Sequence, residues 1–218
     1  MKTEKFPDET VNYRIYELME SEEFEKCKKF VEAELVKTDQ PTVMTKINEC
    51  YQDPRLIQLR KAQLTFIQGV ISNELGQVAK AILKVKRGIS IREDLKDLEE
   101  LDNWNRGLET EVCDTLSDSM PLRCMVKSDT VDDNQLQISN YYSYLGTLYH
   151  KQGDENRFEE CFKKALEIRI GLFGHIDPST LCLLYELSDE FLNKRKFDAA
   201  MSLHTKFVSE LNKSTEAV

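Results

Sequence analysis

Large apolar residues recur every three to four positions along most of the chain, which is the spacing of one face of an α-helix. The clearest stretch covers residues 142–149 and includes Gly146, a small residue where a second helix could approach closely. A turn at Gln152-Gly153-Asp154 follows, and the same period resumes over residues 158–166. The pattern predicts two helices, joined by a short turn, that pack against each other.

This helical pair repeats along the chain. Ser188 lies 42 residues after Gly146, within a similar apolar run over 184–191, and a second run over 197–203 follows it. Near the amino terminus, residues 13–27 predict a further copy in which Cys27 takes a small position. A degenerate copy between them is indicated by four residues with the mutual offsets of Gly146, Gly153, Phe158 and Ala165, namely Gly69, Gly76, Ala81 and Gly88.

An acidic segment interrupts these repeats. Residues 94–133 hold 4 Lys and Arg against 12 Asp and Glu. Their first part, about 94–116, has a helical period that includes the one tryptophan, Trp104, whereas residues 117–135 contain turn formers and no sustained period. We expect a mobile acidic loop there. The chain then divides into degenerate helical repeats over 1–93, an acidic helix and loop over 94–137, two clear repeats over 138–213 and a tail over 214–218.

The two clear repeats resemble the tetratricopeptide repeat (TPR), in particular its 42-residue form in kinesin light chains. The resemblance rests on residues 165–169 (Ala-Leu-Glu-Ile-Arg), on residues 172–178 (Leu-Phe-Gly-His-Ile-Asp-Pro), and on Leu184 and Leu187. The chain departs from the family at Asp177, where His is usual. The resemblance implies an all-α protein, a right-handed α-solenoid of about nine to ten helices, because such units stack to bury their apolar faces.

Composition and charge narrow the class of protein further. Eight glycines and five prolines are few for 218 residues, which disfavours a turn-rich β-protein. The net charge of −9 disfavours binding to nucleic acid or to an anionic membrane surface, and no apolar stretch is as long as a membrane span. Because the opening residues resemble neither a signal peptide nor a transit peptide, we expect a cytoplasmic protein, with the nucleus as a further compartment.

The residues that carry chemistry form no recognisable catalytic or metal-binding motif. The six cysteines include no Cys-x-x-Cys pair, and the three histidines, His150, His175 and His204, are isolated from one another in the sequence. Neither a phosphate-binding glycine loop nor a hydrolase or zinc-protease motif is present. We therefore expect reduced cysteines, no cofactor and no enzymatic activity.

A TPR solenoid offers a groove lined by the first helices of successive repeats, so the resemblance places a partner-binding site there. The side chains expected to face it are Asn140, Ser143, Thr147, His150 and Lys151 in one repeat and Cys182, Tyr185, Asp189 and Asn193 in the next. Polar side chains at this spacing can hydrogen-bond an extended peptide. We expect Tyr185 to be the main anchor and the two basic residues to favour an acidic ligand. The acidic segment 94–133 would then compete for the groove within the same molecule.

We therefore predict a protein-interaction adaptor or scaffold. Two other classes of protein stay open. A structural subunit or assembly factor, built permanently into a larger complex, would carry a large apolar patch on its convex or terminal surfaces. A regulatory remnant of an enzyme would instead carry a polar, ligand-sized pocket whose titratable groups have shifted pKa values.

Overall fold

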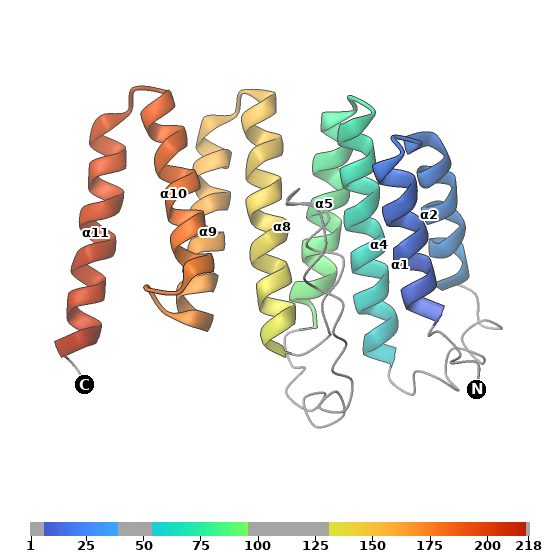
Figure 1. Ribbon diagram of the computed structural model, residues 1–218, viewed down its shortest axis with the longest axis horizontal. Coiled ribbons are helices and arrows are strands. Elements are labelled where there is room, and N and C mark those ends of the chain that lie inside the picture. Colours follow the sequence, from blue (N-terminus) through green and yellow to red (C-terminus); the bar gives the residue numbers. More distant parts are fainter. Residues whose placement is uncertain (1–6, 39–53, 96–130, 217–218) are drawn as a thin grey trace.

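Residues 7–38, 54–95 and 131–216 are described by a computed structural model of the chain (Figure 1). Within these ranges the chain forms eight α-helices and no strand, which confirms the predicted all-α class. The count is lower than the predicted nine or ten, and the additional helix expected over about 94–116 lies, beyond residue 95, outside the described residues. The helices are α1 (Pro7–Glu20), α2 (Phe24–Thr38), α4 (Pro54–Glu74), α5 (Val78–Glu93), α8 (Val131–Gln152), α9 (Glu155–Phe173), α10 (Pro178–Asn193) and α11 (Phe197–Glu216).

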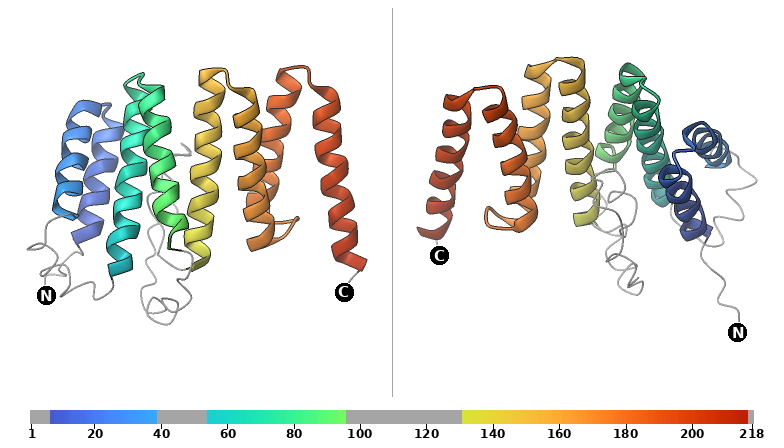
Figure 2. Two further views of the ribbon diagram at one scale, coloured as in Figure 1. Left: turned by 180° about the vertical axis from the view of Figure 1, so that it is seen from behind. Right: turned by 45° about the horizontal axis from the view of Figure 1, so that its top comes forward.

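The helices form a row in which each helix packs against the next described one (Figure 1, Figure 2). Short turns join α1 to α2, α4 to α5, α8 to α9 and α10 to α11, so the row consists of four antiparallel hairpins. All four turns lie at the same edge of the row, the upper edge in Figure 1. Packing therefore follows chain order, as expected for units that each bury an apolar face against their neighbours.

The turn of each hairpin contains a residue with positive φ, a backbone conformation that glycine adopts at the least cost. Gly76 (φ 72°) and Gly153 (φ 83°) take this place in the two middle hairpins. Glu22 and Arg195, each with φ 57°, take it in the first and last hairpins. The turn predicted at Gly153 is confirmed, and the four turns are alike although only two contain glycine.

Small residues mark the places where the two helices of a hairpin cross most closely. A Cβ atom added at Gly146 would lie 2.5 Å from Cδ2 of Phe162 in α9, and one added at Gly69 would lie 2.7 Å from a side-chain atom of α5. In the last hairpin Ser188 takes this place, and its Oγ lies 2.8 Å from Nε2 of His204 in α11. The close helix approach predicted at Gly146 is confirmed.

A stacked pair of aromatic rings joins α4 to α8. The ring of Tyr141 lies 3.9 Å from that of Phe66, centroid to centroid, with 5° between the two planes. The guanidinium group of Arg92 lies 5.2 Å from the centroid of the Tyr141 ring and donates a hydrogen bond to Oδ1 of Asn134 at 2.9 Å. All four side chains are buried. The hairpin of α4 and α5 and the hairpins after the acidic segment therefore share one hydrophobic core, and α1 and α2 form a second one with the other side of α4.

Helix α8 begins earlier than the sequence pattern indicates. It starts at Val131, whereas the predicted acidic loop extends to residue 135 and the predicted repeat begins at residue 138. Asn134 and Gln137 are buried in this first part of the helix although both are polar. The side-chain amide of Asn134 accepts a hydrogen bond from the guanidinium group of Arg92 and donates one to the backbone carbonyl oxygen of Arg92. Because the partner that buries Asn134 is distant in sequence, no apolar period marks this start, and the predicted boundary falls too late.

Glu155, the first residue of α9, is held by two lysines near the turn between α10 and α11. Its carboxylate pairs with Nζ of Lys194 at 2.8 Å and with Nζ of Lys196 at 2.7 Å. Hydrogen bonds from these two ammonium groups lower the pKa of Glu155 from 4.5 to about 2. Because its pKa is lower in the folded than in the unfolded state, Glu155 contributes stability above pH 4.5 and loses that contribution as the pH falls toward 2.

We expect Glu155→Gln to be less stable than the wild type at neutral pH, and this difference to shrink as the pH falls from 4.5 toward 2. The difference should also shrink in 1 M salt, because exposed ion pairs are screened. Thermal unfolding at a series of pH values measures both effects. Glu160→Gln, a change at an exposed glutamate of the same helix, is the matched control. A Glu155→Gln difference that stays constant down to pH 2 would contradict the ion-pair assignment.

Candidate functional site

The residues predicted to face the groove do not all reach the surface. His150, Lys151, Cys182, Tyr185, Asp189 and Asn193 are exposed, and Asn140 and Thr147 are half-buried. Ser143 has no exposed surface, and its hydroxyl donates to the carbonyl oxygen of Asn140 at 3.0 Å within α8. Ser143 therefore does not line an open groove in this structure. The apolar pattern along α8 alone could not predict the burial of Ser143, because neighbouring helices cover that side chain.

Asn140 is engaged in contacts inside the protein. Arg169 of α9 donates from Nη2 to the amide oxygen of Asn140 at 2.8 Å and from Nε to Oγ of Ser139 at 3.1 Å. Its Nη1 donates to the carbonyl oxygen of Ser179 at 2.7 Å. One guanidinium group thereby joins α8, α9 and α10. Asn140 contributes to this junction, so a ligand would have to replace Arg169 in order to use the amide oxygen.

The two basic residues of the predicted groove are also paired. Lys151 donates to Oδ1 of Asn73 in α4 at 3.1 Å. Nδ1 of His150 lies 2.9 Å from Nζ of Lys194, and Nε2 of His150 lies 3.7 Å from Oε2 of Glu190 in α10. An acidic ligand would have to compete with these contacts between helices. The structure therefore lends the predicted preference for an acidic ligand little support.

Tyr185 lies on the last described hairpin. Its side chain is 57% exposed, and the centroid of its ring is 6.3 Å from that of His204 in α11. Tyr185 follows Ser143 by 42 residues and takes the same place in its hairpin, but no described helix follows α11 to cover it. The structure thus associates Tyr185 with α11 and with the end of the row.

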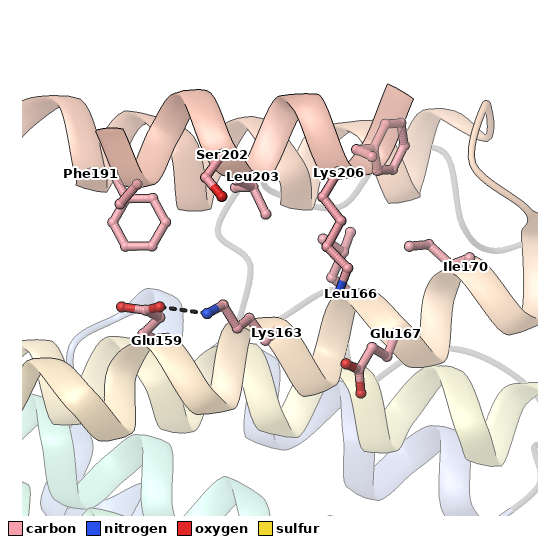
Figure 3. A pocket seen from close by; sticks show the side chains of 11 residues that line it. Glu159, Lys163, Leu166, Glu167, Ile170, Phe191, Ser202, Leu203 and Lys206 are labelled. Carbon is pink, nitrogen blue, oxygen red and sulfur yellow. Dashed lines mark hydrogen bonds and ion pairs between the residues drawn. The ribbon is translucent and has the colours of Figure 1, made fainter. Parts of the chain in front are cut away.

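A crevice that the sequence pattern did not indicate lies between α9 and α11 (Figure 3). Its volume is about 400 Å³. The floor of this α9–α11 crevice is apolar, and its rim is polar and charged. The floor consists of Leu166, Ile170, Phe191, Ala199, Leu203 and Phe207, and the rim consists of Glu159, Lys163, Glu167, Ser202 and Lys206.

Long side chains fill the corresponding space in the preceding pair of hairpins. There Nζ of Lys164 in α9 lies 3.3 Å from Oε1 of Glu93 in α5. Two cations also lie over the ring of Tyr149 in α8. The ammonium group of Lys86 from α5 is 5.7 Å from the ring centroid, and the guanidinium group of Arg157 from α9 is 5.4 Å from it. These charged side chains bridge α5 and α9, so the two second helices are connected across the gap.

Two differences between the repeats account for the open crevice. Ile170 stands 77 residues after Glu93, the same offset as between Gly69 and Gly146, and Ala199 stands 42 residues after Arg157. Isoleucine cannot form an ion pair with a lysine, and alanine is too short to cover the neighbouring aromatic ring. The loss of both bridging side chains is a signal in the sequence that could have located the crevice once the repeats were aligned.

The α9–α11 crevice offers apolar contact area beside charges of both signs. On its rim, Nζ of Lys163 pairs with Oε1 of Glu159 at 2.5 Å. Its lining residues include one hydroxyl, that of Ser202, and neither histidine nor cysteine. Elsewhere in the described part of the chain, no group of three or more His, Cys, Asp or Glu side chains is placed to hold a metal ion. The crevice is therefore suited to bind apolar side chains.

Two of the cysteines belong to the hydrophobic core. Cys27 and Cys161 are free thiols, and burial raises the pKa of each to about 11. Cys182 is a free thiol on the exposed side of α10. The remaining three cysteines, Trp104 and most of the acidic segment lie outside the described residues, so the predicted competition between that segment and the groove stays a prediction.

Comparisons with known proteins do not assign a family. No protein-family model matches the chain, and no curated protein matches it. None of the described helices combines the length and the apolar character that a membrane span requires. The structure itself defines a class: over its described residues the chain is an all-helical protein of four antiparallel hairpins arranged in a row.

Proposed function

We propose that this chain is a TPR-like adaptor of the cytoplasm, without enzymatic activity or cofactor, that binds a segment of another protein. The α9–α11 crevice carries the proposal, because an apolar floor inside a charged rim is the usual form of a peptide-binding groove. The right-handed solenoid rests on the resemblance to TPR proteins, and the matching turns and the small residues where the two helices of a hairpin cross support a repeated hairpin unit.

An amphipathic helix is the ligand that this crevice suits best. The lining residues of α9 extend from Glu159 to Ile170, about three helical turns (Figure 3). A helix with apolar residues at positions i, i+3, i+4 and i+7 would place them on the floor between α9 and α11. Glu167 could then pair with a basic residue of the ligand, whereas Lys163 and Glu159 would first have to leave their own ion pair.

The groove along the first helices is the second location for a partner. A segment bound there would contact Thr147 of α8 and Cys182, Asp189 and Asn193 of α10, which all keep exposed surface. The other residues expected in this groove are buried, paired between helices, or placed at the end of the row. For this reason the crevice is the better supported of the two locations.

Closing the crevice tests the proposed function. Ile170→Glu with Ala199→Arg introduces the residue types of the preceding hairpin pair, so the new carboxylate can pair with Lys206 and the new guanidinium can cover Phe191. We expect partners captured from the native cell to bind this variant at least 2 kcal/mol more weakly, about 30-fold in Kd. Quantitative mass spectrometry measures the loss, and the melting temperature should stay close to that of the wild type.

Thr147→Glu with Lys151→Glu is the matched control, because it places two new charges in the first-helix groove and leaves the crevice intact. Partners that are lost with the crevice variant and kept by the groove variant support the proposal. The reverse result assigns binding to the first-helix groove, and binding that is indifferent to both variants overturns the proposed site. A partner that remains at fixed stoichiometry through high-salt washing would indicate the structural subunit instead.

A further inference from the structure

The carboxyl-terminal end of the row presents an apolar surface. Of the ten large apolar side chains that are exposed in the described residues, five belong to α10 and α11. Figure 1 shows α11 at this end of the row, with no described helix beyond it. We call the surface the end face, and its residues are Tyr185, Leu192, Phe197, Met201 and Val208.

The two helices contribute to one continuous surface. On α11, Met201, His204 and Val208 follow one another at a spacing of three to four residues and therefore share a side of the helix. The ring of His204 faces that of Tyr185 on α10, with 6.3 Å between the ring centroids. Tyr185 thus adjoins the stripe of α11.

Equivalent positions one hairpin earlier are covered. Tyr185 and Val208 follow Ser143 and Leu166 by 42 residues. Ser143 and Leu166 are 0% and 6% exposed, whereas Tyr185 and Val208 are 57% and 52% exposed. The hairpin of Ser143 and Leu166 is followed by α10, which packs on α9. The end face therefore has the position and the pattern of a surface on which a further helix packs.

The sequence of α11 is also more apolar here than the repeat requires. Phe197 and Met201 stand where the preceding second helix has Glu155 and Glu159. Phe197 is 61% exposed and Met201 is 70% exposed. A helix face that stays in contact with water normally has polar side chains. The replacement of two carboxylates by large apolar side chains indicates that this face is covered by protein.

We propose that a second copy of this chain covers the end face, with α11 of one copy packed antiparallel against α11 of the other about a twofold axis. The face needs an amphipathic helix, and α11 is one: its apolar stripe lies beside the stripe that packs on α10. A twofold axis near the middle of the stripe sets Phe197 against Val208 of the copy and Met201 against His204 of the copy. Such a surface is self-complementary, as a twofold interface must be.

Charge does not oppose this pairing. Although the whole chain has a net charge of −9, residues 138–213 hold 10 Lys and Arg against 11 Asp and Glu. The opposite end of the row is a poorer partner. Among the side chains described there, the exposed large apolar ones are Tyr13 and Val36, and they neighbour the ion pairs Arg14–Glu17 and Glu34–Lys37. A twofold contact between like ends is therefore favoured over an open head-to-tail chain.

Sedimentation velocity on the full chain tests the proposal. Between about 1 and 100 µM, the range of weak to moderate affinities, we expect the wild type to approach twice the monomer mass of 25.4 kDa. Met201→Glu should remain monomeric with an unchanged melting temperature, because its side chain is exposed. Leu83→Glu, at an equally exposed position of α5, is the matched control and should still dimerise.

A mixing experiment identifies the occupant as a second copy. Met201→Glu and Met201→Lys should each be monomeric alone, and their equimolar mixture should recover the dimer, because the two sites lie close to the twofold axis. A wild type that is monomeric at 100 µM overturns the proposal, as does a dimer that Met201→Glu leaves intact. A monomeric wild type that captures a different protein through the end face also overturns it. The crevice variant changes only Ile170 and Ala199 and keeps Met201. The outcome of the partner-binding experiment therefore does not affect the outcome of this dimerisation experiment.

Discussion

Replacing Tyr141 by alanine should lower the free energy of unfolding by about 3–5 kcal/mol, the usual cost of truncating a buried aromatic side chain. The Tyr141 ring has no exposed surface, stacks on Phe66 at 3.9 Å and lies beneath the Arg92 guanidinium. Gly88 lies close to the ring as well, since a Cβ atom added there would be 3.4 Å from Cε2 of Tyr141. At about 2–4 °C per kcal/mol for a chain of this size, the melting temperature should fall by roughly 10 °C.

Tyr185→Ala is the control for this substitution, because it removes the same ring from an exposed position. We expect its effect on the free energy of unfolding to stay within about 0.5 kcal/mol at concentrations where the chain is monomeric. Denaturant unfolding followed by circular dichroism compares the two variants. Equal effects would mean that Tyr141 does not connect the hairpin of α4 and α5 to that of α8 and α9.

Gly146→Leu should destabilise the protein by about 1–3 kcal/mol or more, because a bulky side chain overpacks the crossing of α8 and α9. Even a single added Cβ would meet Phe162 at 2.5 Å, and the Phe162 ring is itself held against Phe158 at 4.9 Å between centroids. The ring cannot move away without opening the core. Thermal unfolding of the variant measures the cost.

A pair of glycine-to-alanine changes separates packing from helix propensity. Alanine at Gly171, near the end of α9, meets nothing within 4 Å and should stabilise the helix by about 0.5–1 kcal/mol. Alanine at Gly146 has the same gain in propensity but meets the Phe162 ring, so its net effect should be destabilising. If both changes raised the melting temperature, Gly146 would not mark a close crossing and the repeat assignment would lose its main support.

The two proposed surfaces lie on different sides of α11 and are compatible. The crevice side carries Ala199, Ser202 and Lys206, whereas the end face carries Phe197 and Met201. A twofold dimer through the end faces would leave both crevices open. Such an adaptor would offer two sites for one kind of partner segment, and a partner with two copies of the segment would gain affinity from the linkage.

Much of the helical framework could be predicted from the sequence. The apolar period placed the helices of the hairpin around Gly146, and the offsets of Gly69 and Gly76 located a degenerate copy whose crossing and turn the structure shows. These features depend on residues close together in the chain. Periodicity and small residues record them directly, because a helix must bury its apolar side and a close crossing excludes a side chain.

The fate of individual polar side chains could not be predicted in the same way. Asn140 and Ser143 have the spacing of exposed groove residues, yet Arg169 binds the first and neighbouring helices cover the second. Asn134 falls within the predicted acidic loop, yet it lies in α8, where Arg92 donates a hydrogen bond to its side chain. In each case the residue that contacts or covers the side chain lies on another helix, so the apolar pattern along a single helix cannot predict the contact.

The sequence by itself determined the helical class, the hairpin unit and its close crossings, because these follow from contacts within one unit. Only the tertiary structure decided which surfaces stay open. The crevice exists because Ile170 and Ala199, on different helices, both fail to bridge one gap, and the end face exists because no described helix follows α11. Both surfaces depend on which helices stand side by side, and side-chain bridges between neighbours become visible only when the hairpins are placed in the row.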